Sequence, residues 1–263
     1  PHPFPEFDGH GLSLIPCKSA LWLDYAGNRI GPEPLITGFD THDMCGRLSA
    51  LQKPWSWQIL NWRIAAKEFA ISGAEHNPHI RDSRTLHFLK ETLFGNHRLV
   101  RQMQEESDHF IVSDTLPELV EKMNALNGDD LVRFENVAQA VSSFDDNVRR
   151  GHAQWNDDQL RRITHSRAWR SDRIRTCKPK PLLDHRPLIA IKLRLITRKS
   201  LGGIQTDLAS RALDNNGSPI DGLFAIGEAA GFGGGGACGR RSLEGTFLSG
   251  CILTARAAAE SLD

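Results

Sequence analysis

The feature that most restricts this chain is a glycine-rich run near its C-terminus, placed between a strand-like and a helix-like segment. It extends from Gly227 to Gly245, and eight of these nineteen residues are glycine. Such a backbone can turn with positive φ and lets a flat ligand approach the main chain. A helix that begins near Ser242 would present free N–H groups and a positive dipole end. The order strand, glycine loop, helix therefore predicts a cradle for an electron-rich or anionic group.

Two familiar phosphate-binding motifs do not fit the glycine-rich run. It lacks the GxxxxGK[ST] spacing of a P-loop. It is also not a GxGxxG dinucleotide fingerprint, which needs a βαβ context and an acidic residue further on. A flexible glycine linker is the alternative. The flanking strand and capped helix favour the cradle over the linker.

Residues 1–180 mix short strand signals with helix signals. A turn at Asp24–Arg29 follows a short apolar run and predicts a hairpin. Apolar residues at near-helical spacing predict a helix over residues 55–71. Thr115, with Glu118 three residues later, predicts a capped helix that ends near Gly128. A second apolar pattern predicts a helix over 134–150, followed by Gly151 as its C-cap.

From Pro187 onward the pattern is typical of an α/β segment. Residues 188–193 and 203–207 are predicted strands. Residues 222–227 form a continuous apolar run, which predicts a strand covered on both faces. A turn is predicted over residues 213–219, and a long helix over 243–262 closes the chain.

Charge and cysteine content exclude several classes of function. The 32 basic and 32 acidic side chains balance, which argues against bulk capture by nucleic acid or an anionic membrane. Residues 151–181 are rich in arginine, and a nucleic-acid-binding arm is the alternative there; the interleaved Asp157, Asp158 and Asp172 favour a solvated surface or connection. The five cysteines are scattered without CxxC spacing. They predict reduced thiols in a cytoplasmic protein and no metal site.

Three C-terminal motifs carry a specific resemblance: Leu201–Asp207, Gly222–Gly231 and Arg241–Gly245. In these motifs the chain is similar to the fumarate reductase and 3-ketosteroid dehydrogenase flavoprotein superfamily, and within it most closely to the ketosteroid-dehydrogenase-like branch of FAD-binding dehydrogenases. Weaker similarity upstream, as at Pro54–Trp57 and Asp114–Val120, extends the resemblance over most of the chain.

The resemblance implies roles for particular residues. The cofactor would be FAD, held by Gly227, Gly231 and Gly239 in the loop, by Glu228 at the ribityl or ribose hydroxyls, and by the helix start at Ser242 and Leu243. Arg241 would bind the substrate's carbonyl or carboxylate as the catalytic residue. A guanidinium there would stabilise negative charge that develops on the acceptor. A structural salt bridge is the alternative role of Arg241.

The resemblance also implies the domain organisation and the reaction. Residues 1–180 are expected to form an α+β substrate-capping domain, and residues 181–263 the C-terminal part of a Rossmann-like α/β FAD-binding domain. The enzyme would move a hydride between flavin N5 and a C–C bond beside a carbonyl or carboxylate of a small molecule. The N-terminal GxGxxG unit of such enzymes is not in this sequence. We therefore expect a fragment, with a missing segment or separate chain supplying that unit. A non-catalytic remnant or interaction module is the alternative.

Overall fold

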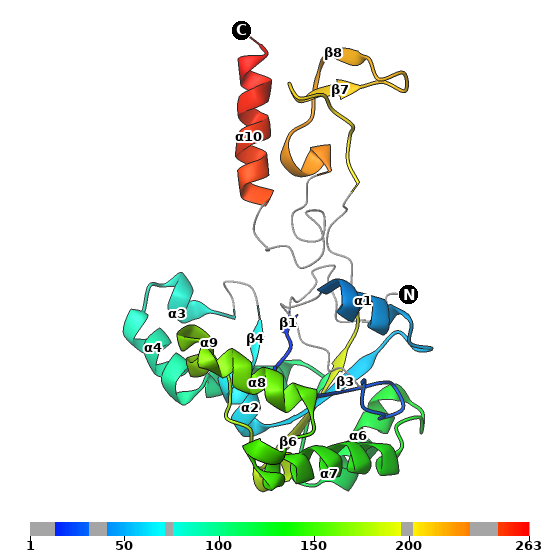
Figure 1. The fold of residues 1–263 in the computed structure, drawn as a ribbon, viewed down its shortest axis with the longest axis vertical. Coiled ribbons are helices and arrows are strands. Elements are labelled where there is room, and N and C mark those ends of the chain that lie inside the picture. Colours follow the sequence, from blue (N-terminus) through cyan, green and yellow to red (C-terminus); the bar gives the residue numbers. More distant parts are fainter. Residues whose placement is uncertain (1–13, 32–40, 72–75, 196–201, 232–246, 263) are drawn as a thin grey trace. The chain divides into compact units, whose positions relative to one another are not determined.

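The computed structural model describes residues 14–31, 41–71, 76–195, 202–231 and 247–262 (Figure 1). The chain divides into two compact units. The larger unit contains residues 1–37 and 46–195, and the smaller contains residues 38–45 and 196–263. The larger unit ends at residue 195 and the smaller unit resumes at residue 196, because the strand over 188–193 still belongs to the sheet of the larger unit. The domain boundary expected near residue 180 stays a prediction.

A four-stranded antiparallel sheet forms the centre of the larger unit. Its order is β2 (Leu21–Leu23), β3 (Ser56–Asn61), β6 (Leu188–Leu193) and β5 (Phe110–Ser113). β3 and β6 pair along their full lengths, with Ile59 opposite Ala190. A separate two-stranded sheet joins β1 (Leu14–Ile15) to β4 (Ala70–Ile71). The strand predicted at 188–193 is confirmed, but it pairs antiparallel with β3 and β5 rather than within an α/β segment.

Helices surround this sheet and bury its apolar side chains. The described helices around it are α1 (Thr41–Ser49), α2 (Trp62–Glu68), α3 (Pro78–Arg81), α4 (Thr85–Phe94), α5 (His97–Glu106), α6 (Leu116–Asn127), α7 (Phe134–Arg150), α8 (Asp158–Ala168) and α9 (Arg170–Arg175). The residues of α1 are divided between the two units. α2 contacts β3, α5 contacts β5, α6 contacts β5 and β6, and α7 contacts β2. Short 3₁₀ turns are η1 (His152–Gln154) and η2 (Leu182–Asp184).

The helices predicted after Thr115 and over residues 134–150 are confirmed. The Thr115 side chain accepts a hydrogen bond from the Glu118 amide, and Gly128 ends α6 in the left-handed conformation. The Glu118 carboxylate does not return to the Thr115 amide as in a full capping box. It accepts instead from the Ser113 hydroxyl at 2.7 Å.

The helix predicted over residues 55–71 is wrong in its first half. Residues 56–61 form β3, and all six are buried because strands pair on both sides of them. Asn61 then ends the strand and caps α2, since its side chain accepts from the Ile64 amide at 3.1 Å. Pairing in the sheet thus overrides the helical spacing of the apolar residues.

In the smaller unit, the described residues form a hairpin, a short turn and a long helix. These are β7 (Arg211–Leu213), β8 (Pro219–Phe224), η3 (Gly227–Ala230) and α10 (Phe247–Glu260). The strand predicted at 203–207 is wrong, because only Thr206 makes an isolated bridge, to Ala212. β8 is not covered on both faces either. β7 is its one partner strand among the described residues, and all but the last residue of β8 is exposed.

The arginine-rich segment and the cysteines also have described positions. Residues 158–168 and 170–175 form α8 and α9 on the surface of the larger unit. Cys17, Cys45, Cys177 and Cys251 are free thiols, as expected, while Cys238 lies outside the described residues. No described helix combines the length and apolar character needed to cross a membrane.

Glu68, at the end of α2, links three distant segments of the larger unit. Its carboxyl group accepts from the Ser19 amide at 2.9 Å, from the Ser19 hydroxyl at 2.6 Å and from the Cys177 amide at 2.7 Å. Burial raises the pKa of this carboxyl above its ordinary value, and the hydrogen bonds from Ser19 and Cys177 oppose the rise. Burial and Glu68 together raise the pKa of the Cys177 thiol to about 12.

The raised pKa of Glu68 predicts a pH dependence of stability. The unfolded state releases this proton first, near the ordinary glutamate pKa of about 4.3. The stabilising contribution of Glu68 is therefore lost as pH rises from there through the raised folded pKa. Glu68→Gln should remove this part of the pH slope in denaturant-unfolding curves, whereas the exposed Glu105→Gln should not. An unchanged slope in Glu68→Gln would show that the carboxyl titrates normally.

Candidate functional site

The main chain of the turn after β8 packs against side chains of α10. Gly227 is buried at φ +54°, and an added Cβ would lie 2.5 Å from the Cys251 sulfur. Its amide donates to the Thr254 hydroxyl at 2.9 Å, and that hydroxyl donates to the Gly250 carbonyl at 2.7 Å. Glycine is therefore required at 227, because a side chain would separate the turn from the helix.

A second close approach involves the segment that precedes β7. A Cβ on Gly203 would lie 2.0 Å from the Gly231 nitrogen and 2.5 Å from the Ala230 carbonyl carbon. The Ile204 amide donates to the Ala229 carbonyl at 2.8 Å. The two stretches of main chain thus touch with no side chain between them, and Gly231 turns away in the left-handed conformation. We define Gly203, Gly227–Gly231 and Thr254 as the glycine turn.

Glu228 is the ionisable side chain on the glycine turn. It is exposed on η3, and its carboxylate has no hydrogen-bond or ion-pair partner among the described residues. Its main-chain carbonyl accepts from the Gly231 amide, which fixes the turn beneath it. An exposed carboxylate that pairs with no other described residue is suited to accept hydrogen bonds from ligand hydroxyl groups.

The structure brings together part of the predicted site. Gly227, Glu228 and Gly231 lie on one turn, as their spacing requires. Gly239, Arg241, Ser242 and Leu243 lie outside the described residues, so their roles stay predictions. Thr254 was not predicted as a site residue, because nothing in the sequence around a helical threonine shows that its hydroxyl accepts a hydrogen bond from a distant amide. Gly203 could have been found, since it belongs to the Leu201–Asp207 motif.

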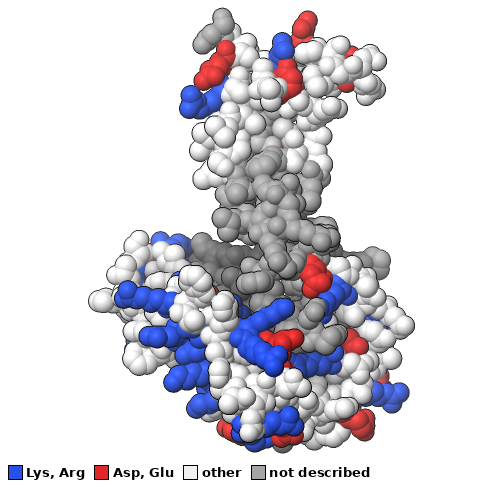
Figure 2. Space-filling view, in the orientation of Figure 1, with Lys and Arg blue, Asp and Glu red and all other residues white. Residues whose placement is uncertain are grey.

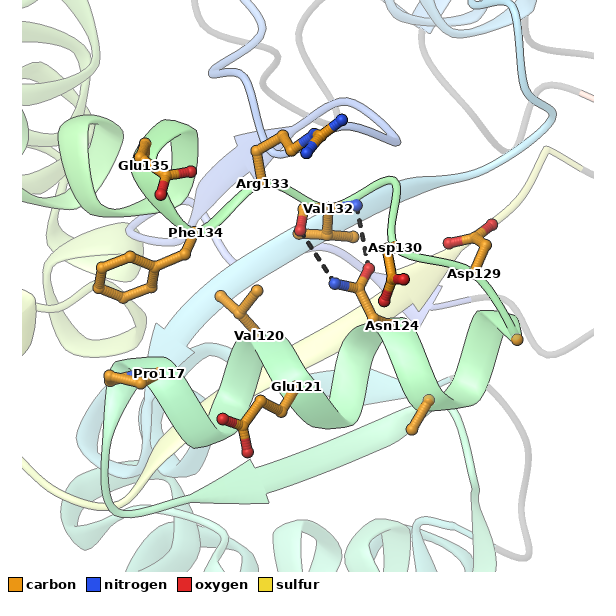
Figure 3. A pocket seen from close by; sticks show the side chains of 12 residues that line it. Pro117, Val120, Glu121, Asn124, Asp129, Asp130, Val132, Arg133, Phe134 and Glu135 are labelled. Atoms are coloured by element: carbon orange, nitrogen blue, oxygen red, sulfur yellow. Dashed lines mark hydrogen bonds between the residues drawn. The ribbon is translucent and has the colours of Figure 1, made fainter.

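Another hollow lies between α6 and the start of α7 (Figure 3). It has a volume of about 760 Å³. Asn124 bridges its floor, with its amide nitrogen on the Val132 carbonyl and its amide oxygen on the Val132 amide, both at 3.0 Å. These bonds fix the loop between two helices. The Glu121, Asp129 and Asp130 carboxylates at this surface do not converge on one point. We therefore interpret the hollow as the space beside a loop that connects two helices.

A family model described as "FAD binding domain" matches residues 5–248 of the chain. A KsdD-like steroid dehydrogenase of Mycobacterium tuberculosis is 42% identical over 258 residues, which is 97% of this chain and 45% of that protein. The Mycolicibacterium smegmatis KsdD-like steroid dehydrogenase is 41% identical over 247 residues, or 93% of this chain and 45% of that protein. The chain thus spans about half the length of these curated relatives.

One solved structure supports the fold. It is a 3-ketosteroid Δ1-dehydrogenase from Sterolibacterium denitrificans, which is 17% identical to this chain with a TM-score of 0.54. The match covers 95% of this chain and 40% of that one. At this identity the match shows a shared mixed helix-and-strand fold alone. The family match and the 42% identical relative confirm the resemblance predicted from the C-terminal motifs.

Proposed function

Because this chain belongs to the FAD binding domain family of flavoproteins, we propose that it forms the flavin-ring side of a FAD-dependent dehydrogenase. The observation that carries the proposal is the glycine turn, where Gly203 and Gly231 bring two main chains into contact without side chains. Such a surface admits a flat ring system close to the backbone. The identity of 42% to KsdD-like steroid dehydrogenases over nearly the whole chain supports the same conclusion.

The residues of the glycine turn would hold the sugar-like part of FAD. The exposed Glu228 carboxylate would accept hydrogen bonds from its hydroxyl groups. Gly227 and Gly231 would let the cofactor lie against the main chain, and Gly239 would extend this surface. Ser242 and Leu243 would direct main-chain N–H groups at the ring from the start of the last helix.

The reaction that we propose is dehydrogenation of a substrate C–C bond beside a carbonyl group, or the reverse reduction. A hydride would pass between one carbon and bound FAD, which supplies the redox chemistry, and a proton would pass between the adjacent carbon and a base. The names of the relatives suggest a steroid as the substrate. Arg241 would bind that carbonyl and stabilise the negative charge that develops on its oxygen. Residues 1–180 would cover the substrate as a capping domain.

The ADP half of FAD needs a further binding unit, which a longer form of the chain or a separate chain would supply. Exposed apolar side chains on α10 fit a surface for such a unit. Leu248, Ile252 and Leu253 are each more than half exposed. An exposed apolar face of this kind marks an interaction site in many proteins.

Anaerobic mixing of the chain with FAD, a 3-ketosteroid and the unmatched region of the M. smegmatis relative tests the proposed function. We expect the visible flavin absorbance to bleach when the steroid is added. FAD that binds but never bleaches with any ketosteroid would contradict the substrate class. A preparation that takes up no FAD at all would favour a non-catalytic interaction module.

A further inference from the structure

A cavity of about 550 Å³ in the larger unit is lined by seven basic side chains among apolar ones. It lies among α2, the end of α4, the start of α5, α9 and the segment that follows α9. None of its described lining residues is a carboxylate. Its seven basic side chains are Arg63, Lys67, Arg167, Arg173, Lys178, Lys180 and Arg186. Figure 2 shows Lys and Arg side chains gathered on the face that carries α8 and α9.

These basic side chains form no ion pair with any described carboxylate, although nearby basic residues do. Arg161 on α8 pairs with Asp158 at 3.1 Å, and Lys18 pairs with Asp172 at 3.2 Å. In the cavity, Arg63 donates to the Lys178 carbonyl at 3.0 Å and Lys67 to the Thr92 carbonyl at 2.8 Å. Carbonyl groups orient these side chains but do not neutralise them. Converging cations without counter-charge repel one another, which an anion in the cavity would relieve.

Two buried polar atoms at the cavity lack partners. The Thr176 side chain is 1% exposed, and its hydroxyl has no hydrogen-bond partner among the described residues. The Nε of Arg63 is buried and unpartnered in the same way. Both atoms are enclosed by protein and do not face the cavity, so it is the charge of the lining that points to a ligand.

The titration of His185 reports the same positive field. Burial lowers the pKa of His185 first, and the charges of Arg63 and Lys180 lower it further, with Asp184 opposing them. Glu68 lies behind Cys177 rather than in the lining, and burial raises the pKa of its carboxyl group, which favours the uncharged form. Its negative charge therefore opposes the positive field of the cavity less than an ordinary carboxylate would.

We propose that this cavity binds a small phosphate-bearing anion that carries two or more phosphate groups. Guanidinium groups match phosphate oxygens in a two-pronged geometry, and lysines add point charges around them. A single carboxylate would neutralise only one of the seven cations. Trp62 and Phe94 on the lining offer aromatic surface to an organic part of the ligand.

Pyrophosphate binding to the full 263-residue chain, followed by isothermal titration calorimetry, tests this proposal. Lys178→Glu with Lys180→Glu changes two exposed side chains and should weaken binding by about tenfold or more. Arg101→Glu with Arg150→Glu makes the same charge change at exposed positions outside the cavity, and should have little effect.

Three results would overturn the proposal. One is the absence of pyrophosphate binding at about 1 mM, where a site of this charge should be occupied. The second concerns the double variants. Equal weakening by both would indicate an effect of long-range charge, and no weakening by Lys178→Glu with Lys180→Glu would place the anion at another site, such as the glycine turn. The third is much tighter binding to a single-stranded oligonucleotide than to pyrophosphate, lost in the same variant, which would make this surface a nucleic-acid contact.

Discussion

Gly203→Ala is expected to weaken FAD binding by about a hundredfold. The new methyl group would stand 2.0 Å from the Gly231 nitrogen and 2.4 Å from the Gly231 Cα, so the two main chains must separate. Neither neighbour is the end of a flexible side chain that could rotate away. A steric cost of about 3 kcal/mol follows from overpacking of this kind. The glycine turn would then lose the Ile204–Ala229 hydrogen bond that fixes its shape.

Amide hydrogen exchange and FAD titration together measure this effect. We expect faster exchange at Ile204 and Gly231 in Gly203→Ala, together with the loss of FAD affinity. Gly46→Ala is the matched control, because an added Cβ there has no neighbour within 4 Å. That variant should bind FAD normally, and alanine should be favoured slightly over glycine in α1. Normal FAD affinity in Gly203→Ala would show that the glycine turn does not hold the cofactor.

Arg241→Ala is expected to lower turnover by about a hundredfold, in the range seen when one stabilising donor of an active site is removed. FAD should remain bound, because the proposed contacts of the cofactor are main-chain groups and the Glu228 carboxylate. The measurement is the steady-state rate of the reconstituted protein with a ketosteroid, alongside its flavin absorbance. Loss of the arginine removes the charge that would stabilise the substrate oxygen as the hydride moves.

Arg256→Ala provides the control for the arginine substitution. Arg256 is exposed on α10 and pairs with Glu260 at 3.4 Å, a contact of small energetic value at the surface. Its removal should leave turnover unchanged. If Arg241→Ala also leaves turnover unchanged but lowers the melting temperature, Arg241 is a structural salt-bridge residue.

Local signals in the sequence predicted the helices that begin with their own caps. Thr115 and Gly128 define the ends of α6, and Gly151 ends α7, because each of these contacts is made within a few residues of chain. The turn at Asp214 has the same origin, since its carboxylate accepts from the Asn216 and Ser218 amides. These elements depend little on the rest of the molecule.

Elements that depend on distant partners were not predictable in this way. Residues 56–61 have apolar side chains at near-helical spacing, yet they form β3 because β2 and β6 pair with them from other parts of the chain. The cavity lined by basic side chains is a similar case. The basic run after residue 151 is visible in the sequence, but its convergence with Arg63 and Lys67 of α2 requires the folded structure.

The proposed site shows the same division. The glycine spacing and the family resemblance indicated a turn that carries Gly227, Glu228 and Gly231, and the structure contains that turn. The contacts that give it shape come from Gly203 and from Thr254 on α10, which lie 24 residues before and 27 residues after Gly227 in the chain. No local pattern connects those positions.

If this chain carries the flavin-ring side of a FAD site, it should bind FAD once the ADP-binding unit is supplied. The most direct test is a titration of the purified chain, mixed with the unmatched region of the M. smegmatis relative, with FAD, followed by the visible absorbance spectrum of the flavin. We predict a saturable change in the flavin band with one FAD per chain, and its loss in Gly203→Ala. A spectrum that stays that of free FAD throughout the titration would contradict the claim.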